Sequence, residues 1–155
     1  MLSILTSFDK PEYSRSMTDS IIKIIIVESD SFIRQGMKKL IEKELDLSVI
    51  LGTENAEEAL SFVSHEHPDL AIVDISLDSE ETGLNFIKTL STRFPELKTL
   101  VLSIHDNNVF AERVFRAGAH GYITKDVAPT VIIESIRTVL SGKAYLYGGM
   151  PGEDK

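Results

Sequence analysis

The sequence contains no cysteine, which excludes disulfide bonds, thiolate metal sites and cysteine nucleophiles. A chain without cysteine is typical of a protein from a reducing compartment. Its apolar runs are far shorter than the roughly 20 residues that a membrane span needs. No basic residue precedes the short apolar run at residues 2–5, as one would in a signal peptide. We therefore expect a cytoplasmic protein.

Positive charge is also scarce, because the chain has 16 basic and 24 acidic residues and a net charge of −8. No cluster of lysine and arginine could neutralise a row of phosphates, so we expect no direct binding of nucleic acid. Glycine-rich phosphate loops are missing as well, since Glu28 stands where one would follow the first apolar run. A small hydrolase or an FMN-binding protein is therefore only a weaker alternative.

The 155-residue chain is instead rich in short β-branched runs that alternate with amphipathic segments. The runs predict strands at residues 21–27, 47–51, 70–74, 99–103 and 120–124. The amphipathic segments predict helices at 31–44, 55–66, 84–93, 107–117 and 129–140. Five such alternations predict an α/β fold, with one five-stranded parallel sheet covered by helices on both faces. We expect residues 1–20 to form a flexible arm, 21–146 a single domain and 147–155 a flexible tail.

Four of the expected strands end in chemically useful side chains, namely Glu28, Asp74, Ser103 and Lys125. Ligands of open parallel α/β sheets bind beyond the carboxyl ends of the strands, so these groups are expected to meet at one rim. A carboxylate beside a divalent cation, a hydroxyl and a lysine can accept a phosphoryl group. The cation screens the carboxylate, while Lys125 and Ser103 can bind the phosphoryl oxygens. Asp74 is the expected acceptor.

Several motifs resemble the receiver domain of two-component response regulators, in particular the receivers of LuxR/NarL-type regulators. The matching stretches are residues 24–28, 32–37, 68–77, 100–103 and 117–126. The resemblance implies a flavodoxin-like (βα)5 fold, doubly wound, with strand order 2-1-3-4-5. It also implies Mg²⁺-dependent phosphoryl transfer to Asp74 from a sensor histidine kinase or phosphotransfer protein. Such a domain is a phosphoacceptor with slow self-dephosphorylation rather than a conventional enzyme.

The resemblance further implies roles for individual residues. Ser103 would be the switch hydroxyl, Tyr122 the aromatic ring that changes rotamer with it, and Lys125 the phosphate-binding ammonium. Glu28, Asp74 and the backbone carbonyl of Ser76 would bind Mg²⁺. These roles are carried over from the family, because spacing alone does not assign them.

The sequence departs from the family pattern at the metal site. Family members usually place two acids after the first strand, whereas here Glu28 is followed by Ser29, which should weaken Mg²⁺ binding. Asp30 is either an additional candidate ligand or only a helix cap. The acidic loop at residues 78–83 is either a source of replacement ligands or a solvated loop. Lys125 is followed by Asp126 where many receivers have proline, a known variation in this subfamily.

Two functional hypotheses follow. In the first, the chain is a phosphoacceptor receiver that signals through a conformational change at its partner or dimer surface. In the second, it is a degenerate receiver that acts as a phosphorylation-independent binding or dimerisation module. Homodimerisation is open in both. Similar proteins begin a linker to a DNA-binding domain near residues 144–146, and we expect no such output domain in these 155 residues.

Overall fold

The computed structural model describes residues 21–104 and 108–147, so the predicted arm at 1–20 and nearly all of the tail at 147–155 lie outside the described residues. The strands are β1 (Ile22–Val27), β2 (Leu47–Thr53), β3 (Leu70–Asp74), β4 (Lys98–Ser103), β5 (Gly121–Thr124) and β6 (Tyr145–Leu146). The helices are α2 (Ser31–Ile41), α3 (Ala56–Glu66), α4 (Glu80–Arg93), α5 (Asn108–Arg116) and α6 (Pro129–Leu140). Strand and helix alternate as the sequence predicts.

All strand pairs are parallel, and the order across the sheet is β2-β1-β3-β4-β5-β6. The predicted order 2-1-3-4-5 is confirmed, but the prediction of five strands missed β6. This sixth strand has two residues, too few to show a period. It forms because the backbone N–H groups of Tyr145 and Tyr147 donate to the carbonyls of His120 and Tyr122, at 3.2 and 3.0 Å.

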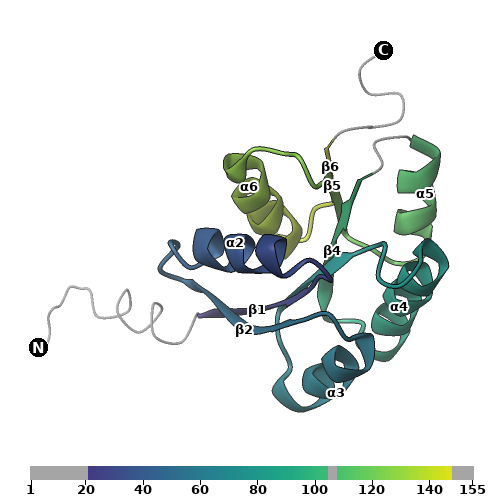
Figure 1. The fold of residues 1–155 in the computed structure, drawn as a ribbon, viewed down its shortest axis with the longest axis horizontal. Coiled ribbons are helices and arrows are strands. Elements are labelled where there is room, and N and C mark those ends of the chain that lie inside the picture. The colour runs from purple at the N-terminus through teal and green to yellow at the C-terminus, as the bar shows by residue number, and fades with distance from the viewer. Residues whose placement is uncertain (1–20, 105–107, 148–155) are drawn as a thin grey trace, which may run out of the picture.

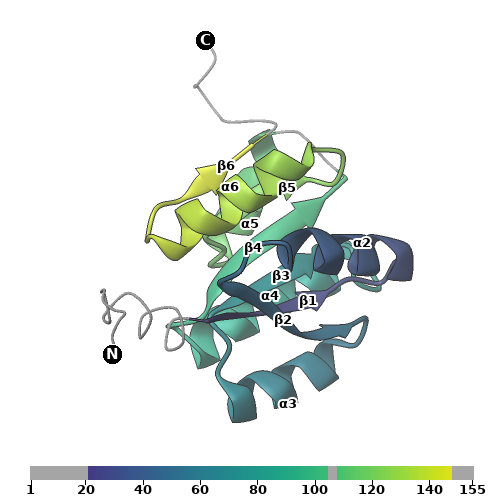
Figure 2. The ribbon, with the colours of Figure 1, turned by 90° about the vertical axis from the view of Figure 1, so that its left-hand side faces the viewer.

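Helices cover both faces of the sheet (Figure 1), and the core has two layers, one on each face. On one face α2 and α6 bury Met37, Ile41, Ile136 and Val139 against the strands. On the other face α3, α4 and α5 pack against the remaining strand side chains. Figure 2 shows α2 and α6 together across one side of the sheet. Because β1 and β3 are covered on both faces, the side chains of residues 24–27 and 70–73 form continuous apolar runs.

Helix caps set where the chain leaves the sheet edge. Asp30 Oδ1 accepts hydrogen bonds from the backbone N–H groups of Phe32 and Ile33, and the Asn55 side chain accepts one from Glu58. At α4 the sequence prediction is wrong, because the helix begins at Glu80 rather than at residue 84. Ser79 caps it, and Glu80 and Glu81 lie in its first turn, where negative charge is favourable.

No helix in the described ranges, 21–104 and 108–147, is long and apolar enough to cross a membrane.

Candidate functional site

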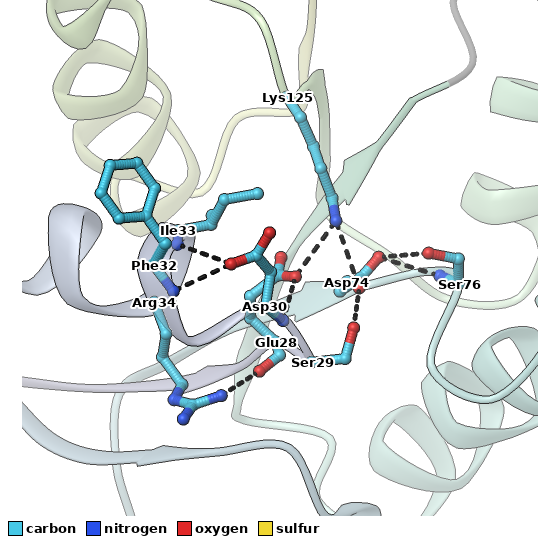
Figure 3. A network of polar contacts seen from close by, with 9 residues as sticks. All are labelled: Glu28, Ser29, Asp30, Phe32, Ile33, Arg34, Asp74, Ser76 and Lys125. Atoms are coloured by element: carbon cyan, nitrogen blue, oxygen red, sulfur yellow. Dashed lines mark hydrogen bonds and ion pairs between the residues drawn. The ribbon is translucent and has the colours of Figure 1, made fainter.

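Three charged side chains from three strand ends meet at the carboxyl edge of the sheet (Figure 3). Lys125, after β5, places its Nζ 3.1 Å from Glu28 Oε2, after β1, and 3.2 Å from Asp74 Oδ2, at the end of β3. Both carboxyl side chains are buried, whereas the lysine side chain is 16% exposed. The strand-end argument from sequence thus placed these three groups together correctly.

Hydrogen bonds hold the Asp74 carboxylate in one orientation. Its Oδ1 accepts from the Ser76 backbone N–H at 3.0 Å and from the Ser76 hydroxyl at 2.8 Å. Its Oδ2 accepts from the Ser29 hydroxyl at 3.3 Å and faces Lys125. Burial pushes the pKa of Asp74 upward, but the Ser76 hydrogen bonds and the Lys125 charge outweigh it, so the pKa is lowered. Asp74 is therefore ionised at neutral pH.

Glu28 lies in a less favourable environment. Its Oε2 accepts from the Asp30 backbone N–H at 3.0 Å and from Lys125, while its Oε1 is buried without a hydrogen-bond partner among the described residues. Burial is the main cause that raises the pKa of Glu28, and repulsion from Asp74 adds to it. The hydrogen bond from Asp30 and the nearby Lys125 oppose the rise only in part.

Ser103 and Tyr122 are both fully buried on neighbouring strands. The carbonyl of Ser103, at the end of β4, accepts the backbone N–H of Lys125 at 2.8 Å, which ties the lysine to that strand. The Tyr122 ring packs in the core on the α3–α5 side, with its centroid 6.4 Å from that of Phe110 in α5. The hydroxyl and switch roles of these two residues stay predictions.

The structure separates the additional acids from this centre. Asp30 directs Oδ1 to the first turn of α2, which agrees with the cap interpretation. Asp78, at a positive φ of 56°, is exposed, and Glu80 and Glu81 belong to α4. Among the described residues no group of three or more acids, histidines and cysteines is arranged to hold a metal. The prediction that Asp30 is an additional metal ligand is untested.

Two carboxylates nevertheless suit the cation that the fold family implies. Mg²⁺ prefers oxygen ligands and keeps several waters, so one or two carboxylates and a phosphate are enough to hold it. The unpartnered Oε1 of Glu28 is a buried carboxylate oxygen that a cation would satisfy. Asp74 lies beside it, linked through the same ammonium. The residues present therefore fit a Mg²⁺ ion, with fewer charges than a site of three acids would offer.

Sequence reasoning missed three neighbours of the site. The Ser29 and Ser76 hydroxyls both donate to Asp74, although only the carbonyl of Ser76 was considered. Arg34 in α2 donates from Nη1 to the Glu28 carbonyl at 2.6 Å. The position of Ser29 directly after Glu28 could have indicated its contact. No local pattern indicates the Arg34 contact, since it depends on how α2 packs.

Comparisons with known proteins give one consistent answer. Residues 24–137 match the response regulator receiver domain family. The chain is 30% identical over 134 residues to "Transcriptional regulatory protein DegU" of Brevibacillus brevis, covering 86% of this chain and 56% of that protein. It is 31% identical over 125 residues to "Oxygen regulatory protein NreC" of Staphylococcus haemolyticus, covering 81% of this chain and 58% of that protein. The chain thus spans little more than half the length of these relatives.

Solved structures agree on the fold. A LuxR-family two-component response regulator from Aurantimonas sp. SI85-9A1 has a TM-score of 0.75 at 26% identity, covering 81% of this chain and 89% of that one. The isolated REC domain of RcsB from Salmonella enterica serovar Typhimurium, in the presence of phosphomimetic BeF3−, has a TM-score of 0.73 at 21% identity, covering 81% and 92%. With its sheet order, its paired carboxylates and its lysine at one edge, the chain belongs to the response regulator receiver domain family.

Proposed function

We propose that this chain is a cytoplasmic phosphoacceptor receiver that takes a phosphoryl group on Asp74 from a sensor histidine kinase or phosphotransfer protein. The observation that carries the proposal is the Lys125 ammonium, 3.2 Å from Asp74 Oδ2 and 3.1 Å from Glu28 Oε2. This cation lies where it can bind phosphoryl oxygens as negative charge grows on them. The comparisons support the membership of the receiver family, and the geometry of this edge supports Asp74 as the phosphoacceptor.

In the proposed reaction an Asp74 oxygen attacks the phosphorus of a phosphohistidine. The nitrogen–phosphorus bond breaks as the oxygen–phosphorus bond forms, and the histidine nitrogen keeps the electron pair. The lowered pKa of Asp74 keeps the attacking group ionised, and the Ser76 hydrogen bonds fix its orientation. Mg²⁺ bound by Glu28, Asp74 and the Ser76 carbonyl would supply further neutralisation of charge.

Phosphorylation of Asp74 would raise the negative charge of that side chain from one to about two in a nearly closed site. Such a change can bias the packing of β4 and β5, which carry Ser103 and Tyr122 and lead into Lys125, and so alter the surface of α5. We propose that a downstream partner or a second copy of the chain reads this surface. Ser103 is the switch hydroxyl in this proposal and Tyr122 the aromatic that responds.

The test is transfer of radiolabel from acetyl phosphate in millimolar Mg²⁺. We expect label on the wild-type chain, none on Asp74→Asn, and normal labelling of Asp78→Asn. Asp78 is an exposed carboxylate in the loop that follows β3, so its removal is a matched control. Label that persists in Asp74→Asn would overturn the choice of residue.

The second candidate is the degenerate receiver, a constitutive binding or dimerisation module. Ser29 favours it, because a neutral hydroxyl rather than a carboxylate contacts Asp74 from the β1 side. The labelling experiment separates the two functions, since a wild-type chain that takes no label while it remains folded is the outcome expected of the degenerate module.

A further inference from the structure

The cation site proposed above has an unusual charge balance. Glu28 and Asp74 bring two negative charges, and the ammonium of Lys125, within 3.1 and 3.2 Å of them, removes one. A divalent cation therefore meets a net charge of only about −1 before any phosphoryl group arrives. Affinity of oxygen sites for divalent cations depends strongly on the number of charged ligands.

Ser29 is the residue that keeps this charge low. Its hydroxyl donates to Asp74 Oδ2 at 3.3 Å, and Figure 3 shows the side chain pointing toward Asp74. A carboxylate at position 29 would lie beside Asp74 and add a third charged ligand to the cluster. The neighbouring Asp30 uses its Oδ1 to accept the N–H groups of Phe32 and Ile33, so that oxygen is committed to the helix cap.

The buried Oε1 of Glu28 gives an independent sign that a cation belongs here. It is the one buried side-chain oxygen or nitrogen in the described part of the chain that has no hydrogen-bond partner. Leaving a buried carboxylate oxygen unsatisfied is costly, and a hydrated Mg²⁺ would satisfy it. The site therefore offers an oxygen ligand for a cation, although its net negative charge is low.

A phosphoryl group on Asp74 would supply the missing charge, since it raises the negative charge of that side chain from one to nearly two and brings oxygens of the kind that Mg²⁺ prefers. We infer that Ser29 gives the resting site a low affinity for Mg²⁺, so that the cation and the phosphoryl group bind cooperatively. The inference rests on the proposed function, which supplies the phosphoryl group. By linkage the group must raise Mg²⁺ affinity by the same factor by which Mg²⁺ raises affinity for the group.

The first experiment uses the metal alone and the full chain. Isothermal titration calorimetry with Mg²⁺ is expected to give a Kd at least tenfold lower for Ser29→Asp than for the wild type. Asn55→Asp is the matched control, because Asn55 lines the same surface hollow as Ser29, and aspartate also caps helices well. That variant adds the same charge at the same edge without contacting Asp74, so its Kd should change by less than threefold.

Two outcomes of this titration would overturn the inference. Equal affinities of wild type and Ser29→Asp would show that position 29 does not set the affinity. An equal gain in Asn55→Asp would show that long-range charge, and not a ligand beside Asp74, sets it. Since Ser29→Asp adds charge to a crowded site, its folding is checked by thermal unfolding with and without Mg²⁺. A bound cation should raise its midpoint more than that of the wild type.

The second experiment adds beryllium fluoride, the phosphomimetic present in the related receiver structure. The Kd of the wild type for Mg²⁺ is expected to fall at least tenfold in its presence, and that of Ser29→Asp by a clearly smaller factor. Equal factors, or no effect in either protein, would refute the cooperativity. Failure of the proposed function is distinguishable, because absence of label on Asp74 leaves the metal-only comparison of Ser29→Asp with the wild type unchanged.

Discussion

Glu28 and Asp74 share one ammonium, yet their pKa values move in opposite directions. The difference comes from hydrogen bonds. Both oxygens of Asp74 accept donors from serine residues, whereas Glu28 keeps one oxygen without a donor. The site therefore favours the ionised form of Asp74 and disfavours that of Glu28. Burying an ionised carboxylate with one unsatisfied oxygen lowers the stability of the fold. Functional sites commonly contain groups that lower stability in this way.

We expect Glu28→Gln to stabilise the chain at neutral pH, by about 0.5–2 kcal/mol, the usual range for stabilising substitutions. The pKa of Glu28 is raised above its ordinary 4.5, so the unfolded chain ionises at lower pH than the folded one. Wild-type stability is therefore lost as the pH rises from about 4.5 through the folded pKa, and glutamine removes this loss. Urea unfolding of both proteins between pH 4 and 8 measures this difference in the free energy of unfolding.

The gain should shrink as the pH falls through 4.5, below which Glu28 becomes protonated in both the folded and the unfolded chain. A variant that is less stable than the wild type at pH 7 would show that the attraction between Glu28 and Lys125 outweighs the burial of the carboxylate. Mg²⁺ binding should weaken in the same variant, because a neutral amide is a poorer ligand than a carboxylate.

The site residues differ in how far sequence could predict them. Strand ends of a parallel sheet share one edge, so the positions of Glu28, Asp74 and Lys125 followed from hydrophobic runs alone. The orientation of Asp30 did not follow, because an aspartate after a strand serves equally as ligand and as helix cap. In the structure Asp30 caps α2 through Oδ1, and its role as a metal ligand stays a prediction. The Ser29 contact depends on the rotamer of one short side chain, which no periodicity encodes.

At the scale of the element, α4 illustrates a signal that was misread. Glu80, Glu81 and Gly83 were interpreted as part of a loop, yet all three belong to the helix. Acids are favourable in a first turn, and the glycine has a packing reason. A Cβ added at Gly83 would overlap the backbone carbonyl of Ile75. The sixth strand was missed for another reason, since two residues carry no pattern and β6 depends on the edge that β5 presents.

Gly83→Ala should therefore destabilise the fold by about 2 kcal/mol or more, since the methyl group displaces backbone rather than a flexible side chain. Ile75 lies between Asp74 and Ser76, so its displacement should also loosen the hydrogen bonds that orient Asp74. The variant is expected to unfold at lower urea concentration and to take up label from acetyl phosphate more slowly.

Gly36→Ala in α2 is the matched control, because nothing lies within 4 Å of the added Cβ. Alanine favours a helix over glycine by about 0.5–1 kcal/mol, so this variant should be more stable than the wild type. If Gly83→Ala behaved like Gly36→Ala, the close approach of α4 to the end of β3 would be refuted.

At the scale of the whole molecule, the dominant feature is negative charge. A net charge of −8 destabilises the compact state through self-repulsion, and salt screens that repulsion. One cluster of opposite charges, formed by Arg137, Asp46 and Glu44, offsets part of this repulsion. Arg137 in α6 binds Asp46 through two hydrogen bonds of 2.7 and 2.8 Å and Glu44 through one of 2.9 Å. It thereby joins the last helix to the loop before β2, and the arginine holds the pKa of Asp46 below its ordinary value.

Added salt should therefore stabilise the wild-type chain but weaken the contribution of this cluster. All three side chains of the cluster are between 37% and 41% exposed, so Arg137→Gln should cost only about 0.5–1 kcal/mol at low ionic strength. The cost should decrease when the salt concentration is raised, as urea unfolding at several salt concentrations would show. Lys143→Gln removes the same charge from an exposed lysine and should cost less. A cost for Arg137→Gln that salt does not change would instead assign the effect to packing of the arginine stem.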